Sequence, residues 1–528
     1  MAAIRARECG ADVVVAEKSH TLTSGAGGCG NDHFVCYIPE VHGPDIELFI
    51  DALKLGQMGH LCQMLGPSRT KTWISKTWDI VRLWDEWGIP MKHDGKWTYS
   101  GHAFPGQLPC FLKYKGKYQK KILTEQARKR GAEIMNRTMV TELLGDTNGV
   151  TGALAIDTRE DKLIEIHAKS VFLATGRATR LFPGVDPAVM NNNNMPLNLT
   201  GDGRAMAYRL GSELTNVELI GHHVGLKNFA RTGQGSWLGV YRGPDGKPLG
   251  PYVSKPDKNL GDIFPEVDKK IFARILESGQ GPVYMDCTGI SDDHLEFLLE
   301  GLVHEGNEAV ITHLKEEHID LRKNPVEFMS YLFTKTAGQL YCNEKSQTSI
   351  RGLFAAGDEF THGISAAATF GWFGGEHAAE HAKNARNLEN DNNKMEKLAN
   401  LIEAIQKRKT GYDWKDANIA LQKTMRDYAG GIRSEHMLNA GLTHLRRIRA
   451  KVDDSLMATD RWELTRCLEV LNLYDLGELV FLAGLERKES RGEHRRVDYP
   501  STDPLLNGKL STIRQVNGEP TFYWKKLK

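Results

Sequence analysis

The sequence predicts an α/β fold in which a parallel-sheet domain is interrupted by an inserted α+β domain and followed by a helical region. Three observations support this fold class. The chain opens on a helix and a strand, two later apolar strands near residues 171 and 353 each stop at a glycine, and residues 220–330 change to Gly/Pro turns followed by helices. The expected divisions are 1–219 and 331–385 for the parallel-sheet domain, 220–330 for the inserted domain, 386–490 for the helical domain and 491–528 for a C-terminal tail.

The composition is that of a soluble globular protein. The 528 residues suffice for two or three domains, and 68 basic residues against 67 acidic ones leave a net charge of +1. This balance gives no indication of nucleic-acid binding or of attraction to an anionic membrane. No apolar run approaches the ~20 residues that span a bilayer, and Arg5, Arg7 and Glu8 do not suit a signal peptide. We therefore expect a cytoplasmic protein with no direct membrane insertion.

The eight cysteines are scattered, and none are spaced C-x-x-C. This pattern is typical of reduced thiols, and it argues against a metal site or an iron–sulfur cluster bound by this chain alone. Any one-electron carrier is therefore expected on another polypeptide.

The first elements are those of a dinucleotide-binding βαβ unit. Residues 1–10 have the pattern of an amphipathic helix, and Ala11 to Glu17 follow as a buried apolar strand that ends in an acid. In such a unit the acid binds the ribose hydroxyls of the adenosine half, and Lys18 stands next to it here. The glycine-rich turn and first strand would precede Met1, so we expect an N-terminally truncated Rossmann-like domain.

Local patterns predict the next elements in order. Residues 45–90 are expected to be helical, with four tryptophans at a spacing more typical of a core than of a cofactor site. We expect further helices over 124–130, 204–210, 292–304, 395–409 and 414–429, a strand from Glu133, and a hairpin of 149–156 with 163–167.

Four segments carry the cofactor signal. After Glu17 and Lys18 comes a glycine-rich loop, whose candidate contacts are Ser24, Gly25, Ala26, Gly27 and Gly28. The second segment is Ala174, Thr175 and Gly176 at the end of a short strand. In the third, Asp202 lies at a helix start that offers N–H donors to a phosphate or a ring edge.

The fourth segment places Gly357 and Asp358 after another buried strand, with Ser365 shortly beyond them. The Asp358 carboxylate can accept hydrogen bonds from a ribityl chain, and the following helix N-terminus can polarise the far end of a flavin. Together with the first segment, this pattern indicates FAD.

These segments resemble the flavoprotein subunits of the fumarate reductase and succinate dehydrogenase superfamily. Gly281-Pro-Val-Tyr-Met-Asp286 is similar to the superfamily's G-P-V-Y-L-D, and Glu489 to Pro500 is similar to its C-terminal S-R-G-x-H-x-R-x-D-Y-P element. Within the superfamily the chain most resembles the alpha subunit of adenylylsulfate reductase. That likeness rests on Ser24-Gly-Ala, on Leu83 to Pro90, and on His362 after the Gly-Asp pair.

The chain also departs from the superfamily pattern. Residues 363–373 lack the arginine of fumarate reductases, and Thr334 to Gln339 lack a dicarboxylate-binding histidine, which argues against reduction of fumarate itself. Covalent flavin attachment uses a histidine just before the glycine loop, whereas His20 comes too early and Gly25 takes the covalent position. The resemblance therefore implies non-covalent FAD.

The resemblance implies two-electron transfer between the flavin and a small anionic substrate, with electrons supplied or removed by an iron–sulfur partner. The implied catalytic residues are His223, Arg231 and His362, for which a packed or surface side chain is the structural alternative. Reduction of an activated alkene carboxylate remains open. A second alternative is a non-catalytic binding protein without FAD, and a third is a gene start placed at an internal methionine. The basic segment 491–496 could contribute to a docking face, but a solvated tail is the simpler expectation.

Overall fold

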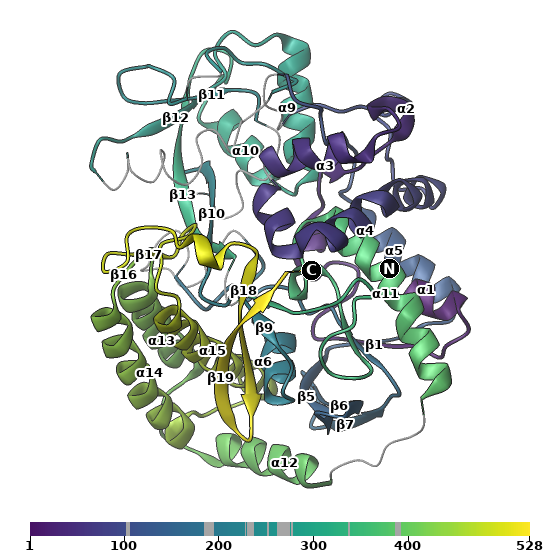
Figure 1. Ribbon diagram of the computed structural model, residues 1–528, viewed down its shortest axis with the longest axis vertical. Helices are drawn as coiled ribbons and strands as arrows, with labels where there is room; N and C mark the ends of the chain where they lie inside the picture. Colours follow the sequence, from purple (N-terminus) through teal and green to yellow (C-terminus); the bar gives the residue numbers. More distant parts are fainter. Residues whose placement is uncertain are drawn as a thin grey trace. The chain divides into compact units, whose positions relative to one another are not determined.

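The computed structural model describes residues 1–56, 58–101, 106–183, 195–227, 229, 237–250, 253–260, 275, 278–335, 338–385 and 392–527. The chain divides into two compact units (Figure 1). The first unit comprises residues 1–25, 124–221 and 333–527, and the second comprises residues 26–123 and 222–332. The second unit thus groups residues 26–123, which begin inside the glycine loop, with the predicted insertion, and sequence patterns alone did not join these segments.

Two pairs of parallel strands define the cofactor side of the first unit. Strand β1 (Val14–Glu17) pairs with β4 (Glu133–Asn136), and β8 (Val171–Leu173) pairs with β15 (Leu353–Ala355). Helix α1 (Ala2–Glu8) precedes β1, so the expected N-terminal helix and strand are both present. Strand β1 is less buried than the sequence predicted, since its first residue, Val14, is 43% exposed.

Helix α11 (Ile364–Asn384) lies against α1 (Figure 1). Glycines allow this close approach, since a Cβ at Gly375 would lie 2.5 Å from the Ala2 carbonyl oxygen. An ion pair between Arg5 and Glu376, with an N–O distance of 2.6 Å, joins the same two helices.

An antiparallel sheet of β5 (Thr138–Asp146), β6 (Gly149–Asp157) and β7 (Leu163–His167) confirms the expected hairpin. Helix α5 (Gln119–Lys129) and helix α6 (Asp202–Arg209) also lie where the sequence predicted helices.

The C-terminal part of the first unit is helical, as expected. Helix α15 is buried along most of its length, and it packs with its neighbours around leucine, valine and phenylalanine side chains. The helices are α12 (Asn392–Lys407), α13 (Trp414–Ala429), α14 (Glu435–Ser455) and α15 (Arg461–Glu486). No helix of the described residues has the length and hydropathy needed to span a membrane.

The expectation of a solvated C-terminal tail is wrong. Strands β18 (Lys509–Val516) and β19 (Glu519–Lys526) form a hairpin, which joins β9 (Leu214–Thr215) and β14 (Gln339–Leu340) in one sheet. The hairpin is ordered because β18 buries Leu510 and Ile513. Leu510 and Ile513 are three residues apart, so the strand lacks the regular alternation of apolar and polar residues that would predict it from sequence. A short parallel bridge between β16 (Ile432–Arg433) and β17 (Arg495–Arg496) fixes the residues before it.

The second unit is built around an antiparallel sheet with order β10-β13-β12-β11. Its core contains Trp237, Met285, Leu298 and Phe328. Trp73 and Trp84 are fully buried, in agreement with the expected core role. Helix α9 begins at a Ser291 cap, whose hydroxyl accepts a hydrogen bond from the His294 amide. The elements are η1 (Ala26–Cys29), β2 (His33–Val35), α2 (Pro39–His42), α3 (Ile46–Leu55), α4 (Gly59–Glu86), β3 (Phe111–Lys113), β10 (Gly221–Leu226), β11 (Val240–Arg242), β12 (Val283–Asp286), α9 (Asp292–His304), α10 (Glu308–Glu316) and β13 (Val326–Lys335).

Candidate cofactor and substrate site

The carboxyl ends of β1, β8 and β15 are joined by one polar network in the first unit. The Lys18 ammonium, just after β1, donates to the Thr200 hydroxyl at 2.9 Å and forms an ion pair with Asp202 at 2.7 Å. Thr175, after β8, accepts a hydrogen bond from the Gly203 amide at 2.9 Å and donates to the Glu359 carboxylate. The segments that sequence patterns singled out separately therefore meet at the N-terminus of α6. Cofactors of open α/β sheets bind at such carboxyl ends.

Lys18 lies in a cluster of buried charges. Its Nζ atom is 2.7 Å from Asp202 and 2.7 Å from Glu469, and Arg180 pairs with Glu469 at 2.6 Å. Burial raises the pKa of Asp202, but the Lys18 ammonium and the hydrogen bonds from Lys18, Asn472 and Thr200 outweigh it, so the pKa lies below its ordinary value. The cluster holds the start of α6 against α15.

Asp358 is held by an arginine from the end of the neighbouring strand. Arg177 Nε donates to Asp358 Oδ2 at 2.9 Å, and both side chains are 16% exposed. The carboxylate is therefore oriented but still accessible. A carboxylate has room for several donors, so one arginine contact leaves capacity for the hydroxyls of a ribityl chain.

Glu359, next to Asp358, is fully buried. One oxygen accepts from Thr175, and the other lies 3.4 Å from Arg204 Nε. Burial raises the pKa of Glu359 to about 7, against the lowering effects of Arg204 and Thr175. The side chain is packed so tightly that a Cβ at Gly203 would lie 2.9 Å from its Oε1 atom and 2.6 Å from Thr175 Oγ1.

The N-terminus of α11 follows this acidic pair. Its cap residue is Gly363 with φ of 88°, and no side chain caps the helix. Amide groups in the first turn of a helix favour negative charge. Ser365 in that turn is buried, and His362, one residue before the cap, is also buried.

The remaining predicted cofactor residues are divided between the two units. The Glu17 carboxylate accepts from the Ser19 amide at 2.9 Å. Ser24 is buried and its amide donates to the His20 carbonyl at 2.9 Å, while Gly25 has a φ of 68°. Ala174 is exposed at the end of β8, and Gly176 has a φ of 89°. Ala26, Gly27 and Gly28 lie in the η1 turn of the second unit, where a Cβ at Gly27 would meet nothing within 4 Å.

The three predicted catalytic residues differ in how far the structure describes them. His362 is described and lies beside the α11 N-terminus. His223 lies in β10, but its side chain is outside the description, and Arg231 lies outside the described residues. Their roles therefore stay predictions.

Three residues of this site were missed by sequence reasoning: Arg177, Arg204 and Glu359. A second acid directly after the Gly-Asp pair was a visible signal for Glu359. Arg204 had no such signal, because its partners are the carbonyl oxygens of Gly338 and Gly176, each at 2.7 Å. Neither carbonyl can be paired with an arginine from sequence alone.

The second unit holds one cluster with metal-ligating side chains among the described residues. Ligand atoms of Asp32, His33 and Glu305 lie within 4.8 Å of one another. The Lys113 ammonium lies 2.8 Å from Asp32 and is itself buried, so a cation already balances the cluster. The cluster is best described as a buried ion network.

The first unit fits FAD on its own geometry. Three features lie at the carboxyl end of the sheet of β8 and β15. Ala174 is exposed at the end of β8, the Asp358 carboxylate is accessible, and no side chain caps the start of α11. Gly357, with φ of 68°, has only the Ala367 Cβ within 4 Å of its own ideal Cβ position, so the backbone there is open to a ligand. Acceptors for hydroxyls and donors for a ring edge are thus both present. An α/β fold whose sheet edge presents these acceptors and donors is typical of the class of flavin-dependent oxidoreductases.

Comparison with known families agrees with this geometry. The FAD binding domain family matches residues 1–370, and the C-terminal domain of fumarate reductase flavoproteins matches residues 418–528. The chain belongs to the fumarate reductase and succinate dehydrogenase flavoprotein family, and its cofactor is FAD.

Two curated relatives show the range of similarity. An uncharacterised FAD-dependent oxidoreductase of Methanocaldococcus jannaschii is 29% identical over 400 residues, which covers 72% of this chain and 69% of the relative. One of the subunits of the fumarate reductase (CoM/CoB) of Methanothermobacter marburgensis is 24% identical, and the match covers 96% of this chain and 95% of that relative.

Solved structures show that the fold is shared over the whole chain. The adenylylsulfate reductase of Archaeoglobus fulgidus has a TM-score of 0.82 at 21% identity and covers 100% of this chain and 93% of its own. E. coli quinol fumarate reductase has a TM-score of 0.82 at 19% identity, with coverage of 100% and 95%. The expected α/β fold of an FAD-binding flavoprotein with a C-terminal helical domain is therefore confirmed.

Proposed function

We propose that this flavoprotein transfers two electrons between FAD and a small anionic substrate, in the manner of the adenylylsulfate reductase alpha subunit, and exchanges these electrons with an iron–sulfur partner. The observation that supports this most strongly is the network from Lys18 to Glu359, which brings predicted cofactor segments after β1, β8 and β15 together at the N-terminus of α6. His362 lies at the start of the helix that leaves this edge.

Each part of the site has a definite task in this proposal. When bound, FAD supplies two-electron transfer at its N5 atom. Glu17 and Asp358 accept hydrogen bonds from the ribose and the ribityl chain, while the α11 N-terminus stabilises negative charge at the ring edge. His362 binds the substrate anion, together with His223 and Arg231. The flavin is held without a covalent bond, because His20 lies too early for attachment.

Purified protein tests the cofactor half of the proposal. Yellow protein whose flavin passes into the supernatant on acid precipitation supports non-covalent FAD. Flavin that stays on the precipitated polypeptide contradicts the non-covalent attachment. Colourless, folded protein contradicts the enzyme and favours the non-catalytic binding protein.

Anaerobic half-reactions test the substrate half. The oxidised flavoprotein is mixed with sulfite and AMP, and the reduced flavoprotein with adenylylsulfate, while flavin absorbance is followed. Arg231→Ala and His362→Ala should each slow the reaction about 10²-fold, which is a typical loss for one electrostatic stabiliser. Rates that do not change in either variant would remove these residues from the site.

A second candidate is the reduction of an activated alkene carboxylate. It is supported by the likeness to the Methanothermobacter marburgensis fumarate reductase, which extends over 96% of this chain. Against it stands the lack of an arginine in residues 363–373. Reoxidation of the reduced flavoprotein by fumarate or a related enoate, but not by adenylylsulfate, would select this candidate.

The partner is tested by co-purification from the native host. None of the eight cysteines are spaced C-x-x-C, which supports a cluster carried by another polypeptide. A co-purifying protein with iron and acid-labile sulfide is the expected result. A flavoprotein isolated without any such companion, yet active with a one-electron carrier, would contradict this part.

A further inference from the structure

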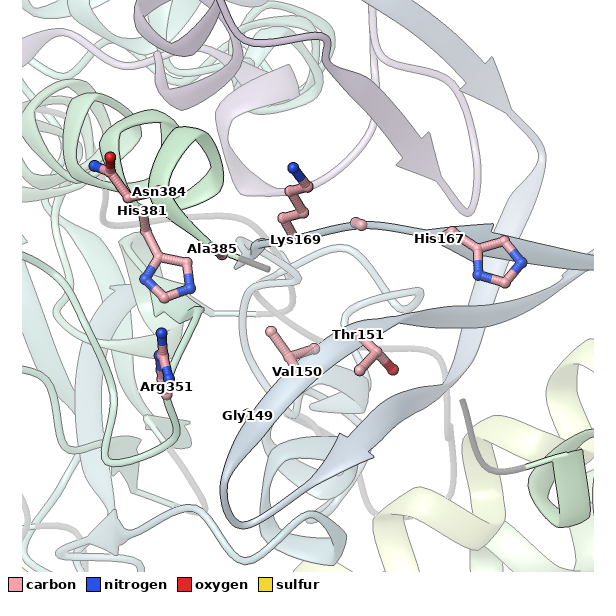
Figure 2. Close-up of a pocket in the computed structure, with 10 residues that line it drawn as sticks. Gly149, Val150, Thr151, His167, Lys169, Arg351, His381, Asn384 and Ala385 are labelled. Carbon is pink, nitrogen blue, oxygen red and sulfur yellow. The ribbon is translucent and has the colours of Figure 1, made fainter. Parts of the chain in front are cut away.

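A cavity lies in the first unit, at the opposite ends of the strands β8 and β15 that carry part of the cofactor site. Its volume is about 770 Å³, within the range of small-molecule pockets. Residues Gly149–Thr151 from β6, His167–Lys169 from the end of β7 and beyond, Arg351 before β15, and the end of α11 line it (Figure 2). We call this cavity the basic pocket.

The basic pocket is separate from the flavin edge. It borders the amino ends of β8 and β15, whereas Asp358 follows the carboxyl end of β15. Helix α11 starts beside the flavin edge and contributes His381 to the pocket. At a rise of 1.5 Å per residue, the start of α11 and His381 are about 25 Å apart along the helix.

The walls are held together by backbone hydrogen bonds, so the cavity is preformed. The Val150 amide donates to the Arg351 carbonyl at 3.0 Å, and the Ala168 amide donates to the Thr151 carbonyl at 2.9 Å. Gly352 permits the approach of α11, because a Cβ there would lie 3.0 Å from His381 Nε2. A φ of 77° at Gly352 also disfavours any other residue.

The ionisable side chains among the residues that line the basic pocket are all basic. Lys169, Arg351, His381 and His167 line it, and the described lining residues include no carboxylate. Figure 2 shows Arg351 extending toward the His381 ring. Burial and the Arg351 cation both lower the pKa of His381, which favours its neutral form. The C-terminus of α11 carries about half a negative charge, which offsets only part of this cationic excess.

We propose that the basic pocket binds a phosphorylated small molecule, with Lys169 and Arg351 contacting its phosphate groups. Guanidinium and ammonium groups are the usual partners of phosphate oxygens, and an arginine can bind two of them at once. The volume exceeds that of a single oxoanion, so the cavity has room for the ester part of the ligand. The interaction is reversible and needs no covalent step.

Calorimetric titration of the FAD-loaded protein at low ionic strength tests this site, with ADP, pyrophosphate and adenosine as probes. Saturating FAD excludes binding of the probes at the flavin edge. ADP and pyrophosphate should bind, and adenosine should bind at least about tenfold more weakly, because it lacks the charged groups that meet Lys169 and Arg351.

Charge-neutralising variants locate the binding. Lys169→Gln and Arg351→Gln should each weaken pyrophosphate binding about tenfold. Lys162→Gln on the same hairpin and Lys383→Gln on the same helix serve as matched controls, since neither residue lines the pocket. Both controls, and Arg231→Ala in the proposed substrate site, should leave the affinity unchanged.

Lys169 and Arg351 are exposed, so neutralising them should not unfold the protein, and the melting temperature of each variant checks this. Absence of pyrophosphate binding at millimolar concentration would overturn the proposal. So would binding that survives the Lys169→Gln and Arg351→Gln double variant, or that is lost in Arg231→Ala instead.

Discussion

Replacing Glu359 by glutamine should change how the stability of the protein depends on pH. The carboxyl has an ordinary pKa of 4.5 and, because of its burial, a pKa of about 7 in the folded chain. Below pH 4.5 both the folded and the unfolded chain carry the proton, so ionisation has no effect. Between pH 4.5 and 7 the folded state retains a proton that the unfolded state has lost, and the free energy of unfolding falls as pH rises. The total loss above pH 7 is about 3 kcal/mol, at 1.36 kcal/mol for each pH unit.

A glutamine side chain carries no ionisable proton, so the Glu359→Gln variant lacks this loss. Relative to wild type, the variant should gain about 3 kcal/mol of stability between pH 4.5 and pH 8. If the chain melts as one unit, this corresponds to a relative rise in melting temperature of about 3 °C, from an unfolding entropy of ~2.1 cal/mol/K per residue. Thermal unfolding of the FAD-loaded proteins across this pH range measures it. The exposed Glu160→Gln variant is the control. Parallel profiles for wild type and Glu359→Gln would refute the reasoning.

Two further predictions concern the frame of the cofactor site. Lys18→Met leaves Asp202 buried without its cation and removes one of the cations that pair with Glu469, which should cost about 3–5 kcal/mol and weaken FAD retention. Adding Asp202→Asn should restore part of the melting temperature, and a single variant as stable as wild type would contradict the buried ion network. Gly375→Ala places a Cβ 2.5 Å from the Ala2 carbonyl oxygen and should destabilise the packing of α1 by about 1–3 kcal/mol. Gly371→Ala, at 3.2 Å from the Met1 Cβ, should cost clearly less, and equal losses would be inconsistent with this packing.

Local sequence patterns were sufficient to predict the elements whose own residues carry a helix cap or a regular spacing of apolar residues. The helix predicted over 292–304 is α9 because Ser291 caps it and its apolar residues repeat at helical spacing. The hairpin β6–β7 is visible as alternation on each side of a polar turn. The C-terminal hairpin escaped prediction because its stability comes from pairing with β9, almost three hundred residues earlier in the sequence.

The same distinction applies to the cofactor site. The positions of Thr175, Asp202 and Asp358 after strands or at a helix start follow from the glycines around them, so the sequence identified them as candidates. What each side chain contacts depends on residues far away in the chain. Lys18 was expected beside the cofactor, and its ammonium group instead has Asp202 and Glu469 as partners, from positions 184 and 451 residues further along the chain. No local pattern carries that information.

The pairing of Arg177 with Asp358 shows why both kinds of information are needed. A carboxylate that binds ribityl hydroxyls must be ionised and must point in one direction, and the sequence alone supplies only its position after a strand. The hydrogen bond from Arg177 Nε to Oδ2 supplies the direction, since it fixes one oxygen and leaves the lone pairs of the other for hydroxyl donors. The arginine comes from the segment that follows the neighbouring parallel strand, so the pairing of β8 with β15 is what brings Arg177 to Asp358.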